Sequence, residues 1–451
     1  MKSLKLTVFS LFCLVIALLT GCVSNKSLPR AVFSDNYTAL ETKSQRQYPG
    51  GNRMLTIDEV VNTSLANNPT YEIARLNMIQ AYSNYYKSIS ELSPAVALGT
   101  GASNQGTGRG GGAAVGASMS KLFNVLNKHA EAEGQKYAYK NVRRMLIEET
   151  MLTYYQIQLD RAKTQIELGN RIYNDQMIKY AESKKNNSIP KGDLLNFKIA
   201  KNNAQTALIY NKALEQINKY KLAKLMGLTT ANIPFNMKLS PINVSDSKNE
   251  YPMSEDYYLD QAIKLRPDLE TQKEILKAAK YSLYKSWAAL SPTANAGLDY
   301  GFTRSFNPSP SSAGIMIVPQ NFDWNYGFDT NWNLLQGGSR IFTIREKQAA
   351  YYAMKEALLK KWISVLNSVR TNYTQLNKSI ARRKITAETL KMAEERRDLL
   401  RKKYNEGKTN IAVLNQAQNN LIATEGEYVK SCIHVAMAKT KLAAAVGDIK
   451  H

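Results

Sequence analysis

The feature that most constrains this chain is a pair of segments, at about 294–303 and 323–334, in which apolar residues alternate with small or polar ones. This period of two predicts β-strands with one apolar face. Strands of about ten residues with aromatic residues along one face are typical of strands that cross a membrane, whereas a soluble sheet rarely exposes such a row. The residues that we expect in the aromatic girdle are Trp324, Tyr326, Phe328 and Trp332.

Strands in a membrane must close into a barrel, because lipid offers no partner to a backbone N–H or C=O group. The chain holds two further, weaker strand patterns, at Ala95–Ser103 and Ala113–Lys121, which we expect to be joined by a glycine-rich connection, Gly106–Gly112. Four strands are too few, since the smallest membrane barrels have about eight. Counting strands therefore predicts a barrel that several chains share.

The chain contains two similar halves. Leu65-Ala66-Asn67-Asn68-Pro69 is answered by Ile263-Lys264-Leu265-Arg266-Pro267, and Lys179–Lys184 is answered by Lys403–Lys408. Several matches in the same order, with gaps that fall in loops, indicate an internal duplication. We place the first repeat at 55–248 and the second at 249–451.

Each repeat has the same predicted order. A β-hairpin, at about 93–121 and 292–334, is followed by a long helical hairpin, at about 122–227 and 335–447. Helices of this length are not stable alone, and only lateral packing in a coiled-coil-like array buries their apolar stripes. The predicted fold is therefore mixed but mainly α, with a shared β-barrel joined to long helices.

The N-terminus is predicted to be an export signal. Lys2 and Lys5 precede an apolar run, and Leu19-Thr20-Gly21-Cys22 follows it, which defines a signal peptide at 1–21. A Cys after Leu-x-Gly resembles the bacterial lipobox, so we expect Cys22 to be lipidated, with palmitate among its acyl chains, and 22–54 to be a lipidated linker. An ordinary signal with an accidental Cys is the alternative. Cys432 is expected to pack as a small apolar residue.

The composition limits the function. Lys and Arg number 60 against 37 Asp and Glu, a formal net charge of +23, which raises nucleic acid or an anionic membrane surface as a partner. The export signal, the scattered basic residues and the lack of a nucleic-acid module argue against nucleic acid. His129, His434 and His451 stand apart and form no catalytic pattern with Ser, Cys or Asp. We therefore expect neither an enzyme nor a metal or other cofactor.

An exported chain with two copies of helix, two strands, long helix and return helix resembles the TolC-like outer membrane efflux protein family, and its lipobox makes it similar to the lipoprotein-type members. The most specific local match is Tyr404–Gln418, which is similar to the family's Tyr-x-x-Gly turn and the Val-Leu-x-x-Gln helix start after it.

The resemblance implies a homotrimer whose three chains form a 12-stranded outer-membrane barrel, continuous with a long α-helical coiled-coil tunnel in the periplasm. It implies the function of an exit duct in a tripartite efflux or type I secretion system. The partners would be a periplasmic membrane-fusion adaptor, an inner-membrane transporter of the proton-driven or ABC type, and outer-membrane lipid, with the lipid anchor on the periplasmic side. The alternative is a structural periplasmic helical lipoprotein without a pore, which leaves the aromatic strands unexplained.

The resemblance also assigns residues. The two turns between long helices would be periplasmic tips that contact the adaptor, with Asn187 and Lys191 in the first half and Gly407 and Lys408 in the second. The first-half turn lacks the glycine of the second.

Past the tips, Asp193 matches an acidic constriction position of the family, and we expect a three-fold ring of its carboxylates to attract cations, with the uncharged Asn415 lining the same throat. A solvated Asp at a helix N-terminus is the alternative for Asp193. Asp299 and Asp329 fall on the strand face opposite the aromatic residues and are predicted to line the barrel lumen. Lys and Arg are then expected on the periplasmic exterior.

Overall fold

The computed structural model of the protein describes residues 54–103, 106–183, 191–228, 233, 238–241, 253–305, 321–332, 338–406 and 408–448. The signal peptide and Cys22 lie outside these residues. In some stretches, such as most of the strand residues, only the backbone is described.

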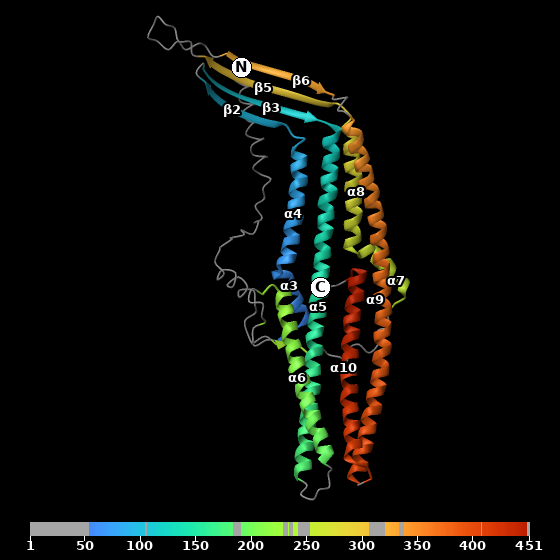
Figure 1. The fold of residues 1–451 in the computed structure, drawn as a ribbon. Helices are drawn as coiled ribbons and strands as arrows, with labels where there is room; N and C mark the ends of the chain where they lie inside the picture. Colours follow the sequence, from blue (N-terminus) through green and yellow to red (C-terminus); the bar gives the residue numbers. More distant parts are fainter. Residues whose placement is uncertain are drawn as a thin grey trace, which may run out of the picture. The chain divides into compact units, whose positions relative to one another are not determined.

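The elements follow the same order in both halves (Figure 1). The first half contains α3 (Ile57–Asn67), α4 (Pro69–Ser90), β2 (Ala95–Ser103), β3 (Gly106–Ala117), α5 (Met119–Ser183) and α6 (Lys191–Leu225). The second contains α7 (Glu255–Leu265), α8 (Pro267–Ala288), β5 (Thr293–Ser305), β6 (Asn321–Asn331), α9 (Ser339–Asn405) and α10 (Ile411–Val446).

Corresponding helices have nearly equal lengths. α3 and α7 each have 11 residues, α4 and α8 each have 22, α5 and α9 have 65 and 67, and α6 and α10 have 35 and 36. The internal duplication is thereby confirmed, as is the mainly helical fold.

Local signals in the sequence explain where the short helices begin. Thr56 and Glu59 form a reciprocal capping box at the start of α3, with the Thr56 Oγ1 atom accepting from the Glu59 N–H and the Glu59 carboxylate accepting from the Thr56 N–H. Ser254 caps α7 through the Tyr257 N–H. Pro69 and Pro267 stand in the first turns of α4 and α8, where a missing N–H removes no helical hydrogen bond.

The four long strands form one antiparallel sheet with the order β2-β3-β5-β6. The register pairs Leu298 with Tyr326 and Tyr300 with Trp324, so the apolar positions of β5 and β6 share one face. Asp299 pairs with Asn325 on the β6 side and with Gly112 on the β3 side, which places it on the face of small and polar positions. A separate parallel pair joins β1 (Met54–Leu55) to β4 (Lys238–Leu239).

The expectation of a glycine-rich connection at Gly106–Gly112 is wrong. These residues form the first part of β3, and they pair with β2 on one side and with β5 on the other. Glycine weakens a strand that stands alone, but here both neighbouring strands provide hydrogen-bond partners for its backbone. The segment that follows also differs, because β3 ends at Ala117 and helix α5 already begins at Met119.

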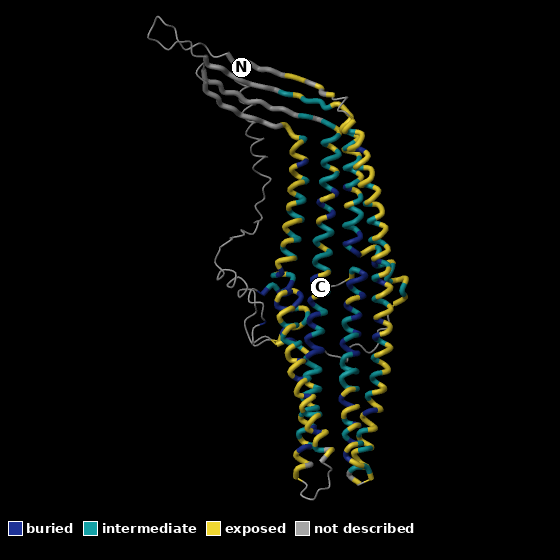
Figure 2. Tube along the Cα trace, in the orientation of Figure 1, coloured by how far each residue is buried: buried dark blue, intermediate teal, exposed yellow. Residues whose placement is uncertain are grey.

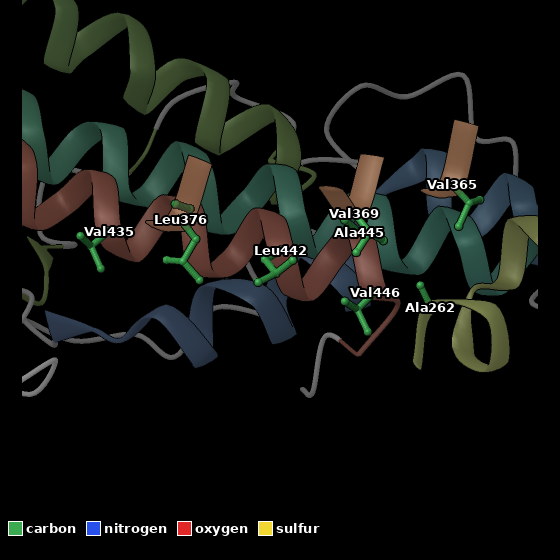
Figure 3. Close-up of a cluster of buried hydrophobic side chains, with 9 residues drawn as sticks. Ala262, Val365, Val369, Leu376, Val435, Leu442, Ala445 and Val446 are labelled. Atoms are coloured by element: carbon green, nitrogen blue, oxygen red, sulfur yellow. The ribbon is translucent and has the colours of Figure 1, made fainter. Parts of the chain in front are cut away.

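The long helices pack side by side in one layer. Near the sheet, neighbours contact one another in the order α4, α5, α8, α9, and toward the other end the order is α6, α5, α10, α9. A buried cluster of α7, α9 and α10 shows how the layer is held together (Figure 3), with Ala262, Val365, Val369, Leu376, Val435, Ala438, Leu442, Ala445 and Val446 in contact. Cys432, which also belongs to α10, is buried, as expected for a residue that packs as a small apolar side chain.

Candidate functional site

The layer of helices has two uncovered edges. One edge is α9, and the other consists of α4 near the sheet and α6 farther away. The described sheet ends at the same two sides, because β2 follows α4 and β6 precedes α9. A single chain therefore leaves the backbone groups of two edge strands and the sides of two helical edges without a neighbour from its own described elements.

Both helical edges contain many exposed residues (Figure 2), and several of these residues have large apolar side chains. On α9 the stripe contains Tyr352, Leu359, Ile363, Ile385, Met392 and Leu399, each more than half exposed. On α6 it contains Leu195, Ile199, Ile209, Tyr210, Ile217 and Tyr220. Ile385, Met392 and Leu399 repeat every seven residues, the spacing of a helix that packs against another helix. Exposed apolar stripes of this length mark surfaces that bind another protein.

The layer also has two different faces. On the first, which we call the covered face, α3 packs on α5, and α7 packs on α9 and α10. The Tyr154 hydroxyl of α5 donates to the Ser240 carbonyl beside β4, and the ring of Tyr373 of α9 packs 5.9 Å from that of Tyr258 of α7. Because α3 and α7 are duplicates that contact duplicate helices, they cover the same face. We call the other side the open face.

The ends of the two long hairpins touch each other. Ile178 of α5, Phe197 of α6 and Ile411 of α10 form a buried cluster, against which Met177, Leu194 and Tyr404 pack. Burial and a hydrogen bond with Tyr180 raise the pKa of Tyr404 to about 12. Tyr180 and Tyr404 occupy corresponding positions of the duplication, so the two hairpins meet through equivalent residues.

Hydrogen bonds stabilise the second turn on both sides of Gly407. The Lys408 N–H donates to the Lys403 carbonyl, and the Asn410 side chain accepts from the Val413 N–H to cap α10. The Lys408 side chain is 70% exposed and lies 2.8 Å from the Glu406 carboxylate, so it is accessible to a partner. Gly407 and Asn187 lie outside the described residues, as does the side chain of Lys191, the first residue of α6.

The two predicted constriction residues are placed differently. Asp193 is the third residue of α6, and its side chain lies outside the described part. Asn415 lies one turn after Ile411, on the side of α10 that packs toward the other hairpin, and its Oδ1 atom is buried without a hydrogen-bond partner among the described residues. A buried amide oxygen without a partner is rare in proteins. Because the Asp193 side chain lies outside the described part, the role of both residues in a throat stays a prediction.

Of the predicted aromatic girdle, Phe328 and Trp332 are 73% and 56% exposed. The Trp332 indole also donates to the Leu290 carbonyl at 2.9 Å, which ties the end of the sheet to the end of α8. The side chains of Trp324, Tyr326, Asp299 and Asp329 lie outside the described part, and only their register is given.

Two other kinds of feature are absent from the described residues. No described helix is long and apolar enough to cross a membrane. Within the same residues, no group of three or more His, Cys, Asp or Glu side chains is placed to hold a metal ion.

Residues 258–448 match the family of outer membrane efflux proteins. No curated protein matches the sequence. The resemblance inferred from the duplicated helices and strands is thereby confirmed by a match that spans most of the second half.

Solved structures share the fold over most of the chain. The outer-membrane channel OprN superimposes with a TM-score of 0.74 at 16% identity, over 87% of this chain and 89% of its own. The MtrE outer membrane channel of Neisseria gonorrhoeae, in its open state, gives 0.72 at 13% identity over 87% and 88% of the two chains. The outer membrane protein VceC of Vibrio cholerae gives 0.71 at 14% identity over 87% and 96%.

Proposed function

Residues 258–448 of this chain match the outer membrane efflux protein family, and we propose that the chain is the exit duct of a tripartite efflux or type I secretion system. Three copies close into a ring. Their strands form a 12-stranded barrel in the outer membrane, and their helices form a tunnel in the periplasm. The duct conducts passively, because the inner-membrane transporter supplies the energy. It performs no catalysis.

The observation that carries this proposal is that both edges of one chain expose an apolar stripe and an edge strand, so the two edges are complementary. In a head-to-tail ring, the α9 edge of one copy packs against the α4 and α6 edge of the next, and β6 pairs with β2. A heterologous contact of this kind closes when its rotation suits a ring. Closure buries both apolar stripes and gives the edge strands the backbone partners that lipid cannot provide. Four strands per chain make three copies a 12-stranded barrel.

The direction in the membrane follows from the ends of the layer. The sheet carries the positions of the aromatic girdle, Trp324, Tyr326, Phe328 and Trp332, and would lie in the outer membrane. The helical hairpins would extend into the periplasm, with Cys22 lipidated at the periplasmic side. Asp299 and Asp329 would then line the barrel lumen.

The hairpin ends are the proposed contact with the adaptor. Lys408 is exposed there, and Asn187, Lys191 and Gly407 belong to the same two turns. The cluster of Ile178, Phe197 and Ile411 holds the two hairpins of one chain together, so adaptor binding near it can change how the tips pack.

The test places a photo-reactive amino acid at position 408 in cells and identifies the captured proteins by mass spectrometry. We expect to capture a periplasmic adaptor together with a transporter. A proton-driven transporter would indicate an efflux system, and an ATP-driven transporter would indicate a secretion system. The control places the same group at Lys277 on α8, far along the chain from both turns, and should capture no adaptor. Capture of neither partner at position 408, with a chain that runs as a monomer, would instead support a structural lipoprotein.

Asp193 is proposed to form the constriction, three carboxylates around one axis, with Asn415 beside it. Clustered carboxylates attract cations, so divalent cations should block the conductance of the purified channel. The block should be lost in Asp193→Asn. A block of equal strength in that variant would remove Asp193 from the constriction.

A further inference from the structure

Five ionisable side chains gather on three neighbouring helices. They are Lys163 of α5, Arg382 of α9, and Glu427, Lys430 and His434 of α10. Glu427 pairs with both Arg382 and Lys430, with the Lys430 Nζ atom 3.2 Å from the carboxylate. One carboxylate is thus shared by two cations.

The groups on α10 lie on the open face. Ala443 and Lys439 line a cavity of about 410 Å³ beside α7, on the covered face. His434 precedes Ala443 by nine residues, which is two and a half helical turns, so it lies on the opposite side of α10. Lys430 lies one turn from His434 and therefore shares its side.

The same spacing places the other two cations. Lys163 follows Tyr154 by nine residues on α5, and Arg382 follows Tyr373 by nine residues on α9. Tyr154 and Tyr373 both contact elements of the covered face. Lys163 and Arg382 therefore also lie on the open face.

The five groups are close enough to affect one another. Burial lowers the pKa of His434, and the charges of Lys430, Arg382 and Lys163 lower it further, while Glu427 acts in the opposite direction. A neutral His434 leaves three cations against one carboxylate. Lys163 makes no ion pair with any residue that the structure describes. One turn from Lys163 on α5 lie Glu167 and the buried Asp160, whose carboxylate accepts from Asn218 of α6 at 2.7 Å, and one turn before Arg382 on α9 lies Lys378.

We propose that Lys163, Arg382 and Lys430 form an anion-binding band on the inner wall of the tunnel, which favours cargo with carboxylate, phosphate or sulfate groups. This inference rests on the proposed function, because the open face becomes the inner wall only when copies close into a ring with α3 and α7 outside. Three copies repeat the cluster around the axis, so their fields add toward a solute in the lumen. The sequence led us to expect Lys and Arg on the exterior, whereas these three lie on the other face.

The band is tested by charge removal in planar bilayers. The variant Lys163→Gln with Lys430→Gln is compared with Lys391→Gln and Lys439→Gln. The second pair removes the same charge from α9 and α10, but on the covered face, since Lys391 follows Arg382 by nine residues and Lys439 lines the cavity beside α7. The two readouts are the reversal potential in a KCl gradient and the concentration of inorganic pyrophosphate that halves the conductance.

The first double variant should shift the reversal potential toward that of K⁺. It should also raise the blocking concentration of pyrophosphate about tenfold, because each copy loses two charge-assisted contacts. The second should behave as the unchanged protein. The direction in which the reversal potential shifts is the readout, rather than its absolute value, because Asp193 is proposed to favour cations at the throat. Salt near 0.1 M keeps the screening length at about 10 Å.

The outcomes separate the two proposals. Conductance with equal effects in both double variants, or with no effect in either, would overturn the band and leave the duct intact. A protein that forms no conducting pore in any variant would overturn the duct and the band together. Equal oligomer masses for all variants show that the substitutions leave assembly unchanged.

Discussion

The two halves of the chain build the same helix joint from different chemistry. In the first half, the return helix α6 ends against the start of α4, and the Asn68 side chain donates to the Leu225 carbonyl at 2.8 Å. In the second half, α10 ends against the start of α8, and Arg266 at the corresponding position donates to the Ala445 carbonyl at 2.9 Å. The first joint is neutral, and the second uses charge.

The charged joint ties together more of the layer. Arg266 donates twice to Asp268, which also accepts from Lys361 of α9 at 2.7 Å, and Arg144 of α5 donates to the Ala444 carbonyl. Cations at a helix C-terminus also interact well with its dipole. Duplication thus preserves the geometry of a joint while its chemistry diverges, and the second joint fixes four helices where the first fixes two.

Breaking the charged joint should have the largest effect. Arg266→Ala leaves the buried Asp268 with Lys361 alone, and removing one partner of a buried ion pair costs about 3–5 kcal/mol. Asn68→Ala removes one hydrogen bond and a helix cap, which costs about 1–2 kcal/mol. Thermal unfolding of both purified variants measures the difference. Equal losses would show that the second joint gains nothing from its charges.

Both joints need a glycine in the left-handed region, and this requirement gives a second comparison. Gly227 has φ +70° and a Cβ there would lie 2.3 Å from the Asn67 carbonyl oxygen, whereas at Gly447, with φ +91°, the closest backbone atoms are 3.0 Å away. The left-handed backbone alone costs about 1–2 kcal/mol for alanine. Gly227→Ala should therefore destabilise more than Gly447→Ala by thermal unfolding. The reverse order would mean that the first joint adapts more easily than its contacts indicate.

Acid should weaken only the second joint. Burial alone would raise the pKa of Asp268, but hydrogen bonds from Arg266 and Lys361 outweigh it and hold that pKa well below the usual range. The stabilisation is fully present above the unfolded pKa of about 3.9 and is lost as the pH falls toward the folded value. Unfolding temperatures between pH 5 and the lowest pH that the protein tolerates measure this loss.

A swap of residues sharpens the test. Arg266→Asn with Asp268→Thr gives the second joint the residues found at 68 and 70 in the first. Its stability should fall less steeply with pH than that of the unchanged protein. An identical slope would assign the acid loss to other carboxylates.

The smallest expected effect is at the tips. Tyr404→Phe removes the hydrogen bond with Tyr180 but keeps the ring in the cluster with Ile178 and Phe197, so we expect a loss of about 1 kcal/mol. Tyr180→Phe should match it, because both residues belong to the same bond. Unequal losses would show a second partner for one of the two hydroxyls.

Much of the fold follows from sequence periodicity. The aromatic alternation of 323–334 predicts a strand, and the repeated Pro69 and Pro267 mark helix starts, because both signals are local. The glycines of β3 show no alternation of apolar side chains, so sequence periodicity does not predict a central strand at this position. The charged joint and the basic cluster were missed as well, since each joins residues that are far apart in the chain. The only local signal for the cluster is the nine-residue spacing that puts its cations opposite the covered face.

The central claim is that open layers close into a ring of three, and the mass of the intact protein extracted from the outer membrane tests it most directly. We predict three chains. Ile385→Ser with Met392→Ser on the α9 stripe should shift the population toward single chains, since each buried side chain contributes about 1.5–3 kcal/mol. The neighbouring pair Lys384→Ser with Lys391→Ser should remain trimeric. A protein that is monomeric before any substitution would contradict the ring.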